Sequence, residues 1–195
     1  MDMFELLKEE STTDDPVKLV VGLLSNDRNL LAQAQSALAE GFGTVTAKSE
    51  EIPFNFTDYY EKEMGPNLIR QWLAFQDLVE AEQLVDFKQT THTLEKRFLG
   101  PNAKRRVNLD PGLLSLHNLV LASTKGFAHR IYLRGGIYAD LALIFQSGKF
   151  QPLAWTYPDY QTPACHDFLM RCRKELLAEA AQQRTGQDNQ VFKAT

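Results

Sequence analysis

The stretch Lys18–Ser25, KLVVGLLS, is a continuous apolar run with the length of a β-strand. A strand that is apolar on both faces is typical of the centre of a sheet. Ser25-Asn26-Asp27 follows with side chains that cap helices. Aliphatic and small residues then recur on one helical face: Leu30, Leu31, Ala34 and Leu38. Gly41 and Gly43 close that helix, so the pattern predicts a central strand followed by a helix.

The segments that follow alternate between extended and helical patterns. We expect extended structure over residues 44–56, a strand within Leu68–Val79, a helix over Ala81–Leu99 and a short strand over Arg105–Leu109. The resulting order is strand, helix, strand, strand, helix, strand. This is the order of a ferredoxin-like split βαβ core.

The second half of the chain predicts additions to that core. Asp110-Pro111-Gly112 ends the short strand, and we expect a second helix from about Leu113 to Ser123. An antiparallel meander and a last amphipathic helix follow, over Ala128–Leu133, Ile137–Phe145, Lys149–Leu153 and Pro163–Gln183. The whole pattern predicts one α+β domain over residues 16–183, with a flexible arm over 1–15 and a flexible tail over 184–195.

The first turn of the meander can be derived from the faces of its strands. A loop made of Gly135-Gly136 alone would scramble the apolar and polar faces of the two strands. A three-residue loop, Arg134–Gly136, pairs Leu133 with Ile137 and keeps Ile131 on the apolar face. We therefore expect the longer loop.

Length and composition exclude several classes of protein. A chain of 195 residues suits one domain, and its net charge of −4 argues against a protein that coats nucleic acid. No apolar run approaches the roughly 20 residues that span a bilayer, and the acidic start MDMFELLKEE has no export signal. We expect a cytoplasmic protein.

The two cysteines are not expected to form a disulfide. Cys165 and Cys172 would lie roughly 10 Å apart on one helix, beyond the reach of a disulfide.

Common catalytic signatures are absent from the sequence. There is no GxxxxGK[ST] phosphate loop, no GxGxxG after a strand and no GxSxG elbow. The histidines are scattered without metal-binding spacing: His92, His117, His129 and His166. The sequence leaves any cofactor unknown, and no metal site is expected.

RRVNLDPG, over Arg105–Gly112, is the first of three unusual polar stretches. A strand that stops here presents Asn108 and Asp110 at its end, where polar groups meet ligands in α/β architecture. The structural alternative is equally simple, because Asp110 and Pro111 are good first residues of a helix.

KGFAHRIY, over Lys125–Tyr132, is the second stretch. Lys125 and Arg130 can converge with Arg106 on a phosphate or a carboxylate. The alternative is a cross-strand pair of Arg130 with Asp140, which the three-residue loop sets opposite each other.

Two aromatic loops make up the third group. TDYYEKEMG carries Tyr59 and Tyr60, and WTYPDY carries Trp155 and Tyr157. These rings can wall a ligand pocket or a partner groove, or they can simply cover the core.

Five motifs together resemble a bacterial family of unknown function, DUF4416: PVKLVVGLLS, FTDYYEKEMG, RRVNLDPG, KGFAHRIYLRGGIYADLAL and WTYPDY. The resemblance covers about Pro16 to Leu177. It implies a small cytoplasmic bacterial protein and brings no established activity, although some relatives carry an automatic label of GTP-binding protein. Asp140 stands where relatives carry Glu, and Gly126 where they often carry Asp.

The leading hypothesis is a cleft that binds a small, anionic or phosphate-containing ligand. Its lining would comprise Arg106, Asn108, Lys125 and Arg130, with Tyr59, Tyr60 and Tyr157 as walls. If the protein is an enzyme, Asp110 or His129 is the general base. The rival hypothesis is a non-catalytic module whose aromatic loops bind a protein or an RNA, with a flat exposed patch and no deep pocket. A homodimer that hides the aromatic rings is a third.

Overall fold

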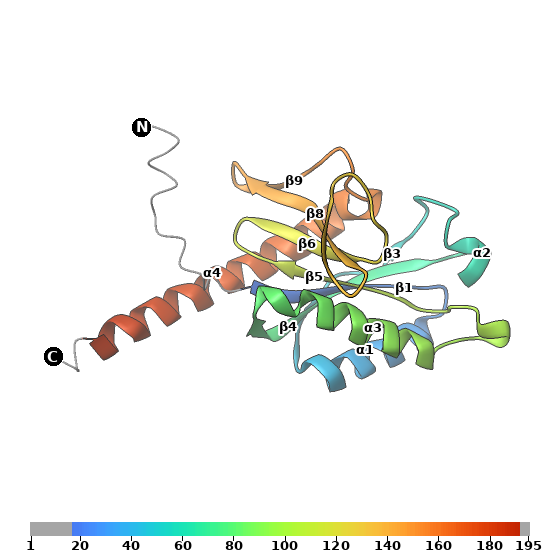
Figure 1. The fold of residues 1–195 in the computed structure, drawn as a ribbon, viewed down its shortest axis with the longest axis horizontal. Coiled ribbons are helices and arrows are strands. Elements are labelled where there is room, and N and C mark those ends of the chain that lie inside the picture. Colours follow the sequence, from blue (N-terminus) through green and yellow to red (C-terminus); the bar gives the residue numbers. More distant parts are fainter. Residues whose placement is uncertain (1–16, 192–195) are drawn as a thin grey trace.

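The computed structural model describes the backbone of residues 17–191 and the side chains of residues 17–101 and 103–181. Over this range the chain is α+β, with four α-helices and a nine-stranded antiparallel sheet (Figure 1). The expected arm over 1–15 lies outside the described residues. Within residues 17–191 none of the helices is long and apolar enough to cross a membrane.

The strands are β1 (Val17–Ser25), β2 (Val45–Lys48), β3 (Ile52–Pro53), β4 (Ile69–Val79), β5 (Asn108–Leu114), β6 (Asn118–Ser123), β7 (Arg130–Arg134), β8 (Ile137–Gln146) and β9 (Lys149–Pro152). The helices are α1 (Arg28–Phe42), α2 (Glu61–Met64), α3 (Leu84–Arg97) and α4 (Pro163–Val191). The sheet runs in the order β2-β4-β1-β5-β6-β8-β7, while β3 pairs with β4 and β9 with β8.

Strand β1 is central, as its apolar run predicts. It pairs with β4 on one side and β5 on the other, and all nine of its residues are buried. Helix α1 begins directly after it, where the Asp27 carboxylate accepts hydrogen bonds from the backbone N–H groups of Asn29 and Leu30. The predicted strand within Leu68–Val79 is also present, as β4.

Helices cover both faces of the sheet. On one face α1 and α3 lie side by side and bury the alternate residues Leu19, Val21 and Leu23 of β1 (Figure 1). On the opposite face α4 packs over Val20 of β1 and over strands on both sides of it. This helix extends to Val191, beyond the end at residue 183 that the sequence pattern predicts.

The helix expected over Leu113–Ser123 is wrong. Strand β5 continues through Asp110-Pro111-Gly112 and turns into β6, so that the segment is a β-hairpin. The Ser115 hydroxyl closes the turn by accepting hydrogen bonds from the backbone N–H groups of His117 and Asn118. Asp-Pro is good helix-start chemistry, but here Pro111 lies inside a strand at a point where β5 lacks a partner on one side.

The hairpin of β7 and β8 has the predicted register and a different turn. Arg130 pairs with Asp140, and Tyr132 with Tyr138, as expected. The turn is the two-residue Gly135-Gly136, because glycine tolerates the positive φ that both positions need. Residues 130–132 keep the predicted partners although the turn is one residue shorter, because the pairing shifts by one residue between Tyr132 and Arg134.

Strand β7 forms one edge of the sheet, and its apolar side chains are not covered. Ile131 is 71% exposed and Leu133 is 40% exposed. The expectation that these residues lie on a buried apolar face is therefore wrong. They belong to an edge strand whose partner in the sheet is β8.

Candidate functional site

The sheet opens beside one half of β5. Residues 112–114 pair with residues 119–121 of β6, whereas residues 108–111 pair with β1 alone. Leu109 turns its backbone N–H and C=O away from β1, and Pro111, two residues further on, faces the same way. Because proline has no N–H to donate, the ladder with β6 stops at Pro111.

Two side chains of α3 replace the missing strand at this opening. The Lys88 ammonium donates to the Leu109 carbonyl oxygen at 3.1 Å, and the Leu109 N–H donates to Glu95 Oε1 at 2.6 Å. Both side chains are buried. Burial raises the pKa of Glu95 to about 7, although the Lys88 charge opposes this. The backbone N–H and C=O of Leu109 are thus satisfied without closing the sheet.

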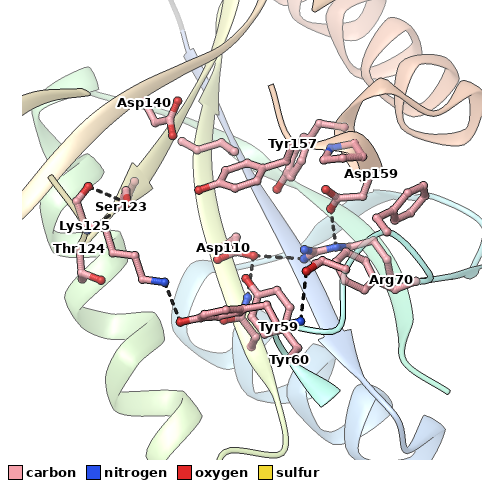
Figure 2. A pocket seen from close by; sticks show the side chains of 18 of the residues that line it. Tyr59, Tyr60, Arg70, Asp110, Ser123, Thr124, Lys125, Asp140, Tyr157 and Asp159 are labelled. Carbon is pink, nitrogen blue, oxygen red and sulfur yellow. Dashed lines mark hydrogen bonds and ion pairs between the residues drawn. The ribbon is translucent and has the colours of Figure 1, made fainter. Parts of the chain in front are cut away.

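A cavity of about 450 Å³ lies at this opening (Figure 2). Its floor contains Asn108 and Asp110 of β5, Leu121–Ser123 of β6, and Lys88 and His92 of α3. Its walls come from two loops and contribute Phe54, Phe56, Tyr59, Tyr60, Tyr157, Pro158 and Asp159. The volume suits a small molecule.

Arg70 of β4 is the central charge of the cavity and is only 3% exposed. Its Nη1 lies 3.2 Å from Asp110 Oδ2, and its Nε lies 2.9 Å from Asp159 Oδ2 (Figure 2). The guanidinium also lies over the rings of Phe54 and Tyr160. A buried cation between two carboxylates and two rings is held in a fixed position.

The Asp110 carboxylate is stabilised in its ionised form. Asn108 Nδ2 donates to its Oδ2 at 2.6 Å, and Lys88 Nζ lies 3.6 Å from its Oδ1. Burial alone would raise the pKa of Asp110, but the charges of Lys88 and Arg70 outweigh burial and hold the pKa below its usual range. A carboxylate with a lowered pKa is a weak base, so this geometry suits binding better than proton abstraction.

Lys125 reaches over the rim of the cavity from the loop after β6. Its ammonium lies 2.7 Å from the Tyr59 hydroxyl and 4.3 Å from the centre of the Tyr59 ring (Figure 2). Among the described residues it contacts no carboxylate. By contrast, Arg105 is paired with Glu63, and Arg70 and Lys88 with Asp110. Lys125 is therefore the cavity cation with a free charge for a ligand.

Arg130 and His129 lie behind the wall of the cavity. Arg130 Nε donates to Asp140 at 2.8 Å, and its Nη2 donates to the Tyr157 hydroxyl. His129 stacks on Trp155, with Nε2 3.6 Å from Asp140. Asp140 and Tyr157 line the cavity, whereas Arg130 and His129 do not.

Six of the nine residues that the sequence singles out line the cavity: Tyr59, Tyr60, Asn108, Asp110, Lys125 and Tyr157. Arg106 lies elsewhere, with Nη2 3.1 Å from the Asp27 carboxylate at the start of α1. The expected convergence of Lys125, Arg106 and Arg130 on one anion is thus not what the geometry presents. Each of the two arginines already has a carboxylate partner.

Three basic residues of the cavity lie outside the stretches that the sequence interpretation singles out: Arg70, Lys88 and His92. Arg70 had a local signal, because a charge inside the apolar strand pattern LIRQWLAF must be buried or lie at an edge. Lys88 and Glu95 share a face of α3 with Leu84 and Thr91, which also indicates burial. His92 had no comparable signal, whereas Asp159 belongs to the loop WTYPDY.

Comparison with known proteins identifies the family and no activity. No curated protein matches the chain. The match to a family model covers residues 15–176, most of the chain, and its description is a domain of unknown function. The chain therefore belongs to the DUF4416 family.

Proposed function

We propose that the protein binds a small anionic molecule, a phosphate-containing one being the leading candidate, in the cavity beside β5. The observation that carries the proposal is Lys125, a cation at the cavity rim whose ammonium contacts Tyr59 and no carboxylate among the described residues. An ammonium of this kind attracts phosphate or carboxylate groups.

The floor of the cavity supports the proposal. Arg70 and Asp159 are almost fully buried, and buried ion pairs often stabilise a fold less than apolar side chains of the same volume would. A protein that needed only stability could fill this opening with aliphatic residues. The fixed Asp110 carboxylate instead offers an acceptor to hydroxyl or amino groups of a ligand.

The walls suit the body of such a ligand. Tyr59 is 55% exposed and Tyr157 is 41% exposed, and each has its hydroxyl engaged by a basic side chain. Aromatic faces beside polar hydrogen-bonding groups are typical of small-molecule sites. The rival interaction module predicts a flat patch without a deep pocket, so the cavity favours the small molecule.

Catalysis is the weaker alternative. The general bases suggested by the sequence are Asp110, which is stabilised as an anion, and His129, which lies outside the cavity. Binding is therefore the function that we propose.

We also propose that the core of this fold is ferredoxin-like. Strands β5, β1, β4 and β2 lie in this order, and each neighbouring pair is antiparallel. Helix α1 connects β1 to the β2 side, and α3 connects β4 to β5. That arrangement supports a split βαβ unit, extended by strands β6 to β9.

A thermal-shift screen followed by calorimetry tests the proposed binding. The panel comprises sugar phosphates, nucleotides and small dicarboxylates, and a ligand at 100 times its Kd should stabilise the protein by about 2.7 kcal/mol. Lys125→Ala should weaken binding of the best ligand by roughly 10-fold or more, because a hydrogen bond to a charged group contributes about 1.5–3 kcal/mol.

Lys62→Ala is the matched control, because Lys62 is an exposed lysine of α2 that does not line the cavity. It should leave the affinity unchanged. Equal affinities of the Lys125 and Lys62 variants would contradict the proposed role of Lys125, and a panel without any binder would contradict the function itself.

A further inference from the structure

His92 is the histidine that lines the cavity. It lies on α3, one helical turn after Lys88, and its side chain is half-buried. Within the described residues no hydrogen bond or ion pair engages its imidazole. The other histidines do not line the cavity. His92 therefore presents an uncommitted donor and acceptor to a ligand.

The charged groups that surround His92 are mostly basic. Lys88 and Lys96 come from its own helix, Arg105 from the segment before β5, and Asp110 from β5. Burial lowers the pKa of His92, the three cations lower it further, and Asp110 opposes them. At neutral pH the imidazole is therefore uncharged and lies in a region with an excess of positive charge.

The excess of positive charge around the uncharged imidazole favours binding of the anionic group of a ligand at this point. The cations nearby are held by other groups: Lys88 by Leu109 and Asp110, and Arg105 by Asn108 and Glu63. Their charges are therefore already engaged by protein groups. His92 can respond in another way, because an adjacent anion favours its protonated form.

We propose that the anionic group of the ligand lies against His92 and that His92 takes up a proton as the anion binds. This inference rests on the proposed function, since it concerns the same cavity. It assigns different roles to two residues. Lys125 supplies a permanent charge at the rim, and His92 supplies a charge that appears only with the ligand.

The proposal fixes the direction of the pH dependence. In the free protein His92 is deprotonated at neutral pH, and in the complex its proton is retained to a higher pH. At pH values between the pKa of His92 in the free protein and its higher pKa in the complex, binding takes up a proton. The affinity for the anion therefore rises as the pH falls through this range. One proton allows at most a roughly tenfold change in Kd per pH unit.

The first experiment is an NMR titration of the imidazole signals of the wild-type protein, with His92→Gln used for assignment. His92 should titrate below the usual histidine range in the free protein. Inorganic sulfate should raise its pKa and leave the other histidines unchanged, relative to sodium chloride at the same ionic strength. Sulfate is a suitable probe because its own charge is constant around neutral pH.

The second experiment measures the Kd of sulfate, and of the best anion from the binding screen, as a function of pH. Wild-type protein and Lys125→Ala should both bind more tightly at lower pH, the variant with a uniformly higher Kd. His92→Gln, which keeps hydrogen-bonding groups but cannot become charged, should show a much weaker pH dependence of the sulfate Kd than wild type, any remainder coming from Glu95 with its pKa of about 7.

The outcomes separate the inference from the proposed function. Binding without proton uptake, or with the same pH dependence in His92→Gln, overturns the inference and leaves the binding function intact. A His92 pKa at or above the usual range in the free protein also overturns it, whether or not a ligand is found. If no anion binds, the proposed function fails together with the inference.

Discussion

The two halves of β5 differ in the groups that form hydrogen bonds with their backbone. From Gly112 to Leu114 the strand has β1 on one side and β6 on the other, and every residue is buried. From Asn108 to Pro111 it has β1 alone, and side chains of α3 reach the Leu109 backbone groups that β6 leaves free. Backbone polar groups are satisfied in both halves.

The difference shows how a sheet can open without losing its backbone hydrogen bonds. A neighbouring strand fills the space beside its partner with side chains on both faces. Lys88 and Glu95 satisfy the same backbone groups from one side and leave room for a cavity. The cavity is therefore a consequence of Pro111 and of two charged residues on one face of α3.

The largest expected effect concerns the buried charges of the open half. Arg70→Met removes the cation that lies between Asp110 and Asp159 and leaves two buried carboxylates without it. Breaking a buried ion pair in this way costs about 3–5 kcal/mol. Denaturant unfolding at neutral pH measures the loss.

Two controls bracket this result. Arg28→Ala breaks an ion pair with Glu51 at the surface, where the Arg28 side chain is 75% exposed, and should change stability by less than about 1 kcal/mol. Combining Arg70→Met with Asp159→Asn should recover much of the loss, because Asp110 keeps Lys88 as its counterion and the Asp159 carboxylate is no longer left unpaired. A loss for Arg70→Met no larger than for Arg28→Ala would show that the open half does not depend on this charge.

The second prediction concerns Glu95, which replaces a strand partner by accepting the Leu109 N–H. Its pKa is raised from 4.5 to about 7 in the folded protein. In the unfolded chain the carboxyl ionises first as the pH rises, so the contribution of Glu95 to stability is full below about pH 4.5 and falls between there and pH 7. The loss amounts to about 3 kcal/mol.

Glu95→Gln keeps a carbonyl acceptor for Leu109 and removes the titration. The variant should be more stable than wild type at pH 8 and close to it at pH 4.5, as measured by denaturant unfolding over the range. Glu82→Gln, at an exposed position just before α3, is the control and should leave the wild-type pH profile unchanged. If the Glu95→Gln variant loses stability with pH as wild type does, the titration belongs to another group.

The sequence predicted the closed part of the fold better than the open part. The run KLVVGLLS and the Asp27 cap are strong local signals, so β1 and α1 were predicted correctly. The hairpin of β5 and β6 was predicted as a helix because Asp110-Pro111 starts helices more often than it interrupts strands. Whether β5 has a neighbour at Pro111 is a tertiary fact that no local pattern contains.

The candidate site divides in the same way. Asn108, Asp110 and Lys125 were singled out because polar residues at the end of an apolar run are visible in the sequence. Arg70 belongs to a different strand, 40 residues before Asp110 in the chain, and the ion pair that joins them depends on β1 lying between their strands. Long-range pairs of this kind follow from topology, which sequence periodicity does not determine.

The smallest predicted effect tests the closed half of β5. A Cβ atom at Gly112 would lie 2.7 Å from Leu121 Cδ2 and 2.9 Å from the carbonyl oxygen of Val120. The Val120 oxygen belongs to the β6 backbone and cannot move without disturbing the ladder, so Gly112→Ala should destabilise the protein by about 1–3 kcal/mol. Gly41→Ala is the matched control: beyond the adjacent helix backbone nothing lies within 4 Å of the added Cβ, and alanine in α1 should stabilise by about 0.4–1 kcal/mol. Changes of opposite sign in the free energy of unfolding, measured with denaturant, would show that β6 is held tightly where it pairs with β5. No change for Gly112→Ala would mean that the two strands can separate further and that the opening is not confined to residues 108–111.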